Sequence, residues 1–302
     1  MNKTMLKAAL LILCALSPAL FAGAADTERL QTNCPACDDF GWQLAITPYS
    51  FRLYPISEAI DKTAQVGIKY IGLSGNINVD AKTTVKVLDL TDEQLQAIRK
   101  KCDEDGIKII NLGIVPLPAD EAECRKAFDF AKKLGVDTIV AEPPQEALDI
   151  VEKLCKEYNI KVAIHDHPRP SHYWNPDTVL AAIKGRTPLM GACADVGHWV
   201  RSGLDPVECL KKLDGHVICL HFKDVVPDKP NEGPPPPNGA RKMHDVPWGT
   251  GDSNVKGMME ELKRQHFHGA FYVEYEYHWA ISQPEIAKSV KYFNATAAEL
   301  AK

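Results

Sequence analysis

The chain lacks an excess of positive charge, and it has no long apolar run beyond its first residues. Lys and Arg together number 35 against 40 Asp and Glu, which gives a formal net charge of −5 and a pI of about 6.1. A nucleic-acid-binding surface normally carries a basic footprint, so we expect no nucleic-acid partner. After residue 25, no stretch approaches the length of a membrane span.

One further motif is missing, and another lacks the elements that would flank it. No G-x-G-x-x-G follows the first expected strand, so the usual nucleotide cradle of an open α/β sheet is absent. Cys34 and Cys37 form a CPAC, but it lacks the preceding strand and following helix of a redox motif. A local disulfide, inert free thiols, and redox or metal chemistry are the alternatives. Six further cysteines lie beyond residue 37, and most of them are expected to pack in the core: Cys102, Cys124, Cys155, Cys193, Cys209 and Cys219.

The N-terminus predicts an exported protein. Lys3 and Lys7 precede an apolar stretch from Ala8 to Phe21, and small residues follow, as in a signal peptide over residues 1–25 that contains Cys14. An uncleaved anchor is the alternative, but the apolar core is short for a bilayer span. We expect the periplasm as the destination and no membrane association after cleavage, although the leader itself does not distinguish periplasm from medium. Residues 26–39 form a polar N-terminal segment.

From residue 40 to 302, strand-like and helix-like segments alternate eight times. This rhythm predicts α/β architecture as one domain, a closed (β/α)8 TIM barrel, with an open doubly wound sheet as the alternative. Thr91 and Gln94 predict a capping box, and Gly135 predicts a helix C-cap. The expected strands are Trp42 to Thr47, Tyr70 to Leu73, Lys108 to Gly113, Thr138 to Ala141, Lys161 to Ile164, Met190 to Ala194, Val217 to Leu220 and Ala270 to Val273.

One segment interrupts the alternation. Residues 225–251 contain four consecutive prolines, which cannot join a helix or a central strand. The segment therefore predicts a long loop after the seventh strand, on the rim of the barrel mouth or over it. An irrelevant surface insertion is the alternative.

Polar side chains stand where five successive apolar strands end: Glu142, His165, Asp195, His221 and Glu274. The carboxyl ends of barrel strands form one mouth, so these side chains are expected to meet there. Imidazole and carboxylate ligands without thiolate favour Mn²⁺, Zn²⁺, Co²⁺ or Fe²⁺ over a structural zinc. The sequence therefore predicts a divalent-metal site.

Neighbouring residues supply candidate substrate contacts. Strand alternation places His167 on the side of His165, and Lys223 on the side of His221. His198 lies one turn beyond Asp195. The candidate substrate-binding residues are His198, Lys223, His244 in the proline-rich loop, and Trp199. A tryptophan near a strand end can stack on a sugar ring, and rim packing is the alternative.

Four short motifs carry a resemblance to a known family. DVGH begins at Asp195, HFKD at His221 and GTG at Gly249, and VEYE ends at Glu276. Over most of residues 40 to 300 the chain resembles the xylose isomerase-like barrels, which include sugar isomerases, ketose 3-epimerases, inosose-processing enzymes and endonuclease IV. The resemblance to the epimerase branch implies metal ligands at the ends of strands five to eight, at His165, Asp195, His221 and Glu274.

One departure affects the expected mechanism. The epimerase branch has glutamate where this chain has His165, so its exchange of a proton between two opposed carboxylates is not carried over. Glu142, Glu274 and His167 are the candidate catalytic residues. The resemblance implies a carbohydrate isomerase or epimerase that removes a proton next to a carbonyl through an enediolate.

Two other functions stay open. A metal-dependent lyase or hydratase of keto-sugars or 3-keto-glycosides would share the first step, and a sugar-binding protein would have no chemistry. Phosphodiester cleavage is disfavoured by the acidic charge. The expected partner is a small carbohydrate, and the sequence does not indicate an oligomeric state.

Overall fold

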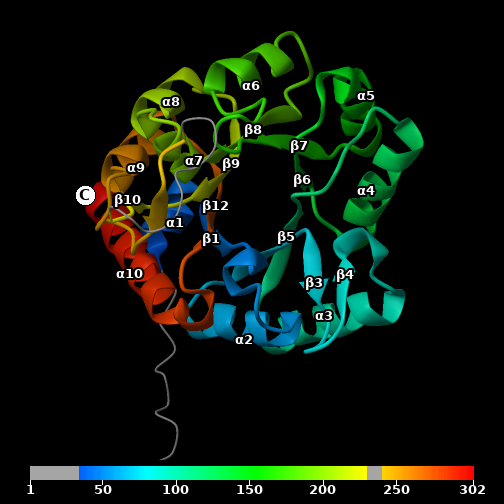
Figure 1. The fold of residues 1–302 in the computed structure, drawn as a ribbon, viewed down its shortest axis with the longest axis horizontal. Coiled ribbons are helices and arrows are strands. Elements are labelled where there is room, and N and C mark those ends of the chain that lie inside the picture. Colours follow the sequence, from blue (N-terminus) through cyan, green and yellow to red (C-terminus); the bar gives the residue numbers. More distant parts are fainter. Residues whose placement is uncertain (1–33, 230–239) are drawn as a thin grey trace, which may run out of the picture.

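Eight parallel strands close into a barrel at the centre of the computed structural model, which describes residues 34–229 and 240–302 (Figure 1). Each strand lies beside the strands that precede and follow it in the barrel, and the first pairs with the last, so the predicted (β/α)8 barrel is confirmed. The barrel strands are β1 (Trp42–Ile46), β2 (Tyr70–Leu73), β5 (Lys108–Leu112), β6 (Thr138–Ala141), β7 (Lys161–His165), β8 (Met190–Asp195), β9 (Val217–Phe222) and β12 (Gly269–Val273).

The strands form because their apolar runs are buried on both faces. All four residues of β6 are buried, as are all six of β8. Side chains that point inward fill the barrel, and those that point outward pack under the helices. Each strand matches its predicted range to within two residues, and β8 and β9 run further than predicted, to Asp195 and Phe222.

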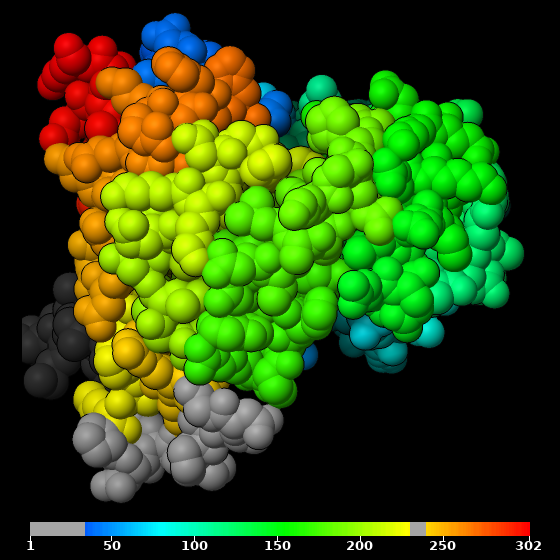
Figure 2. Space-filling model, turned by 90° about the horizontal axis from the view of Figure 1, so that it is seen from above, coloured from blue at the N-terminus to red at the C-terminus, as the bar shows by residue number. Residues whose placement is uncertain are grey.

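Helices surround the barrel as an outer layer (Figure 1), and in the space-filling view the middle of the chain, in green to yellow-green, forms much of the visible surface (Figure 2). The capping box of Thr91 with Gln94 is confirmed, and so is the left-handed C-cap at Gly135. The helices after the barrel strands are α2 (Ile56–Gln65), α3 (Asp92–Glu104), α4 (Glu121–Leu134), α5 (Leu148–Tyr158), α6 (Pro176–Ile183), α7 (Val196–Arg201), α8 (Pro206–Lys212), α9 (Val255–Arg264) and α10 (Gln283–Leu300). Short 3₁₀ turns are η1 (Pro48–Phe51), η2 (Val87–Asp89), η3 (Gln145–Ala147) and η5 (Trp279–Ile281).

The described N-terminal end differs from the expectation for the CPAC motif. A helix, α1 (Pro35–Phe40), begins inside the motif, and Cys34 and Cys37 form a disulfide. A proline at the first helical position has no N–H to leave unpaired, which explains why the helix begins there. This helix packs against α10, so the two ends of the described chain lie side by side (Figures 1 and 2). The six cysteines expected in the core are free and buried.

Two antiparallel hairpins leave the alternation of strands and helices. One joins β3 (Asn76–Asn78) to β4 (Thr84–Lys86), and the other joins β10 (Val225–Pro227) to β11 (Met243–Asp245). The second hairpin lies within the predicted loop over residues 225–251, where Val225–Pro227 pairs with Met243–Asp245. The four prolines at 234–237 fall outside the described residues, and so do the predicted signal peptide and the first part of the polar segment.

Within the described residues, no helix is both long enough and apolar enough to cross a membrane.

Candidate metal centre and active site

Four polar side chains meet at the carboxyl end of the barrel, because each one stands at or just beyond the end of a buried strand. His165 and Asp195 are the last residues of β7 and β8, His221 is the next-to-last residue of β9, and Glu274 directly follows β12. In the register of β8 and β9, Asp195 lies opposite His221. The strand ends therefore bring these side chains to one level of the mouth, as predicted.

The ligand atoms of these four residues face a common point. His165 Nε2 lies 3.1 Å from His221 Nδ1, and that Nδ1 lies 3.1 Å from Glu274 Oε2. Asp195 Oδ2 lies 3.6 Å from His165 Nε2. One ligand atom from each residue lies within 4.8 Å of the others, and all four residues are buried. Ligands that each bind one cation at about 2.0–2.2 Å are spaced in this way.

A buried ammonium group balances part of the negative charge at this point. Lys223 Nζ lies 2.8 Å from Asp195 Oδ2, 2.8 Å from Glu274 Oε2 and 3.0 Å from Glu276 Oε2. The Lys223 side chain is fully buried, so its charge is not screened by water. Three carboxylates thus face one ammonium, and the Arg201 guanidinium, 3.7 Å from Glu276 Oε2, offsets part of the remaining negative charge.

The raised pKa of His165 also indicates that positive charge is favoured at this point. Burial disfavours the protonated imidazole, but hydrogen bonds to Asp195 and Glu142 outweigh burial and raise the pKa of His165 to about 10. Asp195 Oδ2 is buried, and its close partners are the Lys223 ammonium at 2.8 Å and His165 Nε2 at 3.6 Å. A metal ion that binds these atoms would displace the proton of His165 and supply positive charge in its place. The four residues therefore suit a divalent metal of the class that prefers imidazole with carboxylate, such as Mn²⁺, Zn²⁺, Co²⁺ or Fe²⁺.

The Glu142 carboxylate contacts the imidazoles of His165 and His167. Its Oε1 lies 3.2 Å from His165 Nδ1 and also contacts His167 Nδ1, while Ser171 Oγ donates to its Oε2 at 3.2 Å. Burial raises the pKa of Glu142, but the hydrogen bonds to His165 and His167 outweigh it and lower that pKa to about 2. Such a carboxylate fixes the orientation of a ligating imidazole and increases its basicity.

A cavity of about 230 Å³ opens over the cluster. Its lining includes four imidazoles and two carboxylates, contributed by His165, His167, His198, His221, Glu274 and Glu276. Glu142 is not part of this lining. The His167 side chain is 49% exposed, and its Nδ1 is turned toward Glu142, which leaves Nε2 free for a bound molecule. An oriented imidazole beside a candidate metal site can move a proton.

Sequence reasoning missed a layer of charge beneath His198. Arg201 Nη2 lies 2.9 Å from Asp245 Oδ2, and its Nη1 lies 3.3 Å from His198 Nδ1 and 3.7 Å from Glu276 Oε2. Arg201 lies three residues after His198, at the spacing that places two side chains on one face of a helix. No sequence signal points to Asp245, because it reaches Arg201 from β11 across 44 residues.

The structure brings together all but two of the predicted site residues. Trp199 is 1% exposed and packs in the core, so its ring is not available to stack on a sugar. His244 lies on β11, where its Nδ1 is 2.7 Å from Asp228 Oδ1 and its ring stacks on Tyr277. Neither residue lines the cavity over the metal cluster. The position of Trp199 near a strand end does not fix which way its side chain points, and the position of His244 in the loop does not fix which groups its ring contacts.

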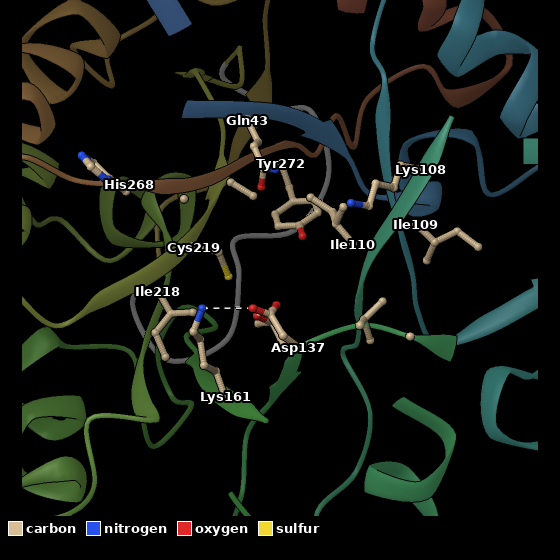
Figure 3. A pocket seen from close by; sticks show the side chains of 15 residues that line it. Gln43, Lys108, Ile109, Ile110, Asp137, Lys161, Ile218, Cys219, His268 and Tyr272 are labelled. Carbon is tan, nitrogen blue, oxygen red and sulfur yellow. Dashed lines mark hydrogen bonds and ion pairs between the residues drawn. The ribbon is translucent and has the colours of Figure 1, made fainter. Parts of the chain in front are cut away.

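A second cavity, of about 280 Å³, lies at the opposite end of the barrel (Figure 3). In Figure 3 the Lys161 ammonium points at the Asp137 carboxylate, and the two groups are 3.2 Å apart. The lining of this second cavity includes residues at the amino ends of strands, such as Gln43 and Lys108. Catalytic groups of (β/α)8 barrels lie at the carboxyl ends, so we do not assign chemistry to this cavity.

The fold and the cluster define a (β/α)8 barrel protein with a candidate metal centre at the carboxyl ends of its last four strands. The chain belongs to the xylose isomerase-like TIM barrel family, whose model matches residues 60–296. The predicted family is therefore confirmed. None of the curated proteins is similar enough in sequence to match.

Three solved structures illustrate the similarity. An uncharacterised protein from Parabacteroides distasonis shares 34% identity over 84% of this chain and 98% of its own, with a TM-score of 0.64. A xylose isomerase-like TIM barrel protein from Mycobacterium smegmatis, in complex with magnesium, shares 16% identity over 85% of this chain and 97% of its own, with a TM-score of 0.65. D-allulose 3-epimerase from a Methylomonas species, in complex with D-allulose, shares 13% identity over 84% and 97%, with a TM-score of 0.63.

Proposed function

We propose that this protein is a divalent-metal-dependent carbohydrate enzyme that removes a proton next to a carbonyl group, with isomerisation or epimerisation as the outcome. The observation that carries the proposal is the buried cluster of His165, Asp195, His221 and Glu274 beside a cavity lined by further acid–base groups. A sugar carbonyl and its neighbouring hydroxyl are oxygen ligands that suit such a site. The complex of the Methylomonas epimerase with D-allulose supports a small sugar as the substrate class.

A divalent cation, when bound, polarises the carbonyl and makes the adjacent C–H more acidic. The residues of this chain would do the rest. His167 accepts the proton at Nε2, because Glu142 holds its Nδ1 and stabilises the imidazolium that forms. Glu276 also lines the cavity and is held 3.0 Å from the Lys223 ammonium. Glu276 is a carboxylate in this ion pair, so it would return a proton from another direction only after it has taken one from solvent.

The position at which the proton returns decides the product. Return to the other face of the same carbon gives an epimer, and return to the adjacent carbon gives an isomer. Glu274 was a candidate base, but it contacts both His221 and Lys223 and is 8% exposed, so we assign it to the metal cluster. Glu276, with its side chain 24% exposed, has the greater access to the substrate.

A lyase is the second candidate. It would use the same first step and then expel a group from the β carbon, giving an unsaturated keto-sugar. One observation favours it: His165 stands where the epimerase branch has glutamate, and Glu142 lies behind the imidazoles and not in the cavity lining. The His167–Glu142 pair could protonate a leaving group as well as accept a proton.

The experiment that tests the proposal is proton NMR of the zinc- or cobalt-loaded protein in D₂O with ketoses, inososes and 3-keto-glycosides, after excess cobalt is removed. We expect deuterium next to the carbonyl of at least one substrate. His167→Gln should abolish the exchange and keep the metal, while Ser171→Ala, which removes only a hydroxyl that donates to Glu142, should keep most of it. Tight sugar binding without exchange in any metal-loaded sample would instead identify a sugar-binding protein.

We also propose that the protein works outside the cytoplasm, in the periplasm. The signal-peptide pattern of residues 1–25 supports this, and so does the Cys34–Cys37 disulfide, because disulfides persist in oxidising compartments. Cell fractionation with mass determination of the mature N-terminus tests it. A full-length chain recovered from the cytoplasm would contradict the proposal.

A further inference from the structure

A side cavity adjoins the proposed active site. It has a volume of about 420 Å³ and lies between the turn after β1 and the β3–β4 hairpin. Tyr49, Ser74 and Gly75 line both this cavity and the one over the metal cluster. A molecule held at the metal cluster could therefore extend past Tyr49 into the side cavity. We call this second space the side cavity.

The polar groups of the side cavity suit hydroxyl groups. Its lining includes Arg52, Asn76 and Thr84, which together offer guanidinium, amide and hydroxyl groups. Asn78 holds the wall together, because its Nδ2 donates to the Arg52 carbonyl at 2.9 Å and its Oδ1 accepts from Thr84 Oγ1 at 2.7 Å. Asn76 is exposed at the start of β3. Its amide has both donors and an acceptor for a ligand.

Aromatic rings stand at the edge of this space. The rings of Tyr49 and Trp279 are 6.3 Å apart and nearly perpendicular, and the Arg52 guanidinium lies 4.6 Å and 4.8 Å from their centroids. Tyr54 ties the two loops together, because its Oη donates to the Ala280 carbonyl at 2.6 Å. Aromatic faces and a few placed polar groups are the usual lining of a small-molecule site.

Exposed apolar surface gathers on the same two loops. Among the described residues, the large hydrophobic side chains that remain exposed are Tyr49, Leu53 and Ile281, at 37%, 57% and 69%. Tyr49 and Leu53 follow β1, and Ile281 follows β12, so all three belong to the rim beside the side cavity. Of these three side chains, Tyr49 alone lines the side cavity, so its exposed ring is the apolar surface that faces a ligand there.

A phosphate group is a poorer occupant. Arg52 is the one Lys or Arg in the lining of the side cavity, as far as the described residues go. Its guanidinium is already stacked against two rings and donates to the Tyr49 hydroxyl. Phosphate recognition usually combines a free bidentate arginine with further cations or backbone N–H groups.

We propose that the side cavity is a second saccharide subsite, so that the substrate is a glycoside with two linked rings. The reacting sugar ring occupies the cavity over the metal cluster, and the attached ring lies against Tyr49 with its hydroxyls at Asn76 and Arg52. Trp279 extends the apolar surface at the rim. This inference rests on the proposed function and names its substrate class.

Calorimetry with the zinc-loaded full chain tests the inference without depending on turnover. The probes are methyl glycosides with one ring, the matching disaccharides and the one-ring 6-phosphates, each in gluco, galacto and manno forms. We expect the second ring to lower Kd about tenfold, which corresponds to about 1.4 kcal/mol. Asn76→Trp, which fills the side cavity, and Trp279→Ala should each remove most of this gain and change the one-ring Kd less than about twofold.

Leu53→Ala is the matched control, because Leu53 is exposed on the same loop and does not line the side cavity. Its disaccharide Kd should match that of the wild type. Equal Kd values for one and two rings would overturn the inference, and so would a preference for the 6-phosphate that is lost in Arg52→Ala. Failure of the proposed function looks different: disaccharides would still bind more tightly, but no substrate would exchange its proton in D₂O.

Discussion

Lys223→Met removes the only ammonium that faces Asp195, Glu274 and Glu276 in the described structure. Methionine keeps most of the volume of the side chain, so the change isolates the charge. The two contacts at 2.8 Å are each worth about 6 kcal/mol at an effective dielectric constant of about 20. Desolvation of the ammonium offsets much of this attraction, because the side chain is fully buried.

The net effect in the metal-free protein should be large. Removing one partner of a buried ion pair leaves uncompensated carboxylates, which costs about 3–5 kcal/mol of unfolding free energy. For a domain of this size, that loss corresponds to a fall in Tm of roughly 10 °C. We expect this fall in EDTA, measured by differential scanning calorimetry.

Addition of zinc or cobalt should narrow the gap, because a divalent cation supplies positive charge to the same carboxylates. The rise in Tm on metal addition should therefore be larger for Lys223→Met than for the wild type. Lys101→Met is the matched control: Lys101 pairs with Asp105 at 3.1 Å, but its side chain is 25% exposed and lies far along the chain from the cluster. It should cost at most about 1 kcal/mol and leave the metal-induced rise in Tm unchanged.

A metal-free Lys223→Met protein with the Tm of the wild type would refute this reasoning. Equal metal-induced rises in Tm for the variant and the wild type would refute the charge balance at the proposed metal site.

Three further results are expected. Glu142→Gln should weaken metal binding about 10–100-fold in a competition titration with a chelator, because His165 loses the carboxylate that holds its Nδ1. An unchanged metal affinity would show that Glu142 does not support the site. Asp224→Asn should lower the free energy of unfolding, measured in urea, by about 3 kcal/mol. The Asp224 carboxylate accepts hydrogen bonds from four backbone N–H groups, those of Gly249, Thr250, Gly251 and Ser253. A loss under about 0.5 kcal/mol would contradict this role. Reduction of the Cys34–Cys37 disulfide should lower the free energy of unfolding by no more than about 2 kcal/mol, since the disulfide closes a very short loop. Calorimetric scans with and without reductant measure this loss. A much larger loss would mean that α1 is needed for the stability of the whole barrel.

The barrel and the meeting of polar side chains at its mouth could be predicted because both follow from the order of residues along each strand. An apolar run of strand length that ends in His165 or Asp195 fixes the element and also the end of the barrel at which the polar residue stands. In parallel strands, neighbouring ends lie at one level. Local sequence therefore carries this part of the site.

Other features depend on contacts between distant segments, which no local pattern contains. Glu142 was expected as a base or ligand, but its role behind His165 and His167 depends on the side-chain positions of two strands. The pairing of Val226 with His244 joins residues on either side of the proline run. Trp199 follows a strand end yet points into the core, because α7 begins directly after Asp195 and turns that ring inward.

The need for a metal can be measured in one titration, in which the rate of deuterium incorporation next to the substrate carbonyl is followed as zinc or cobalt is added to the metal-free protein. We expect a negligible rate without metal, a linear rise, and a break at one equivalent per chain, with no rise for His221→Ala. Exchange at full rate in the metal-free protein, or a rise with metal that His221→Ala does not alter, would contradict this expectation.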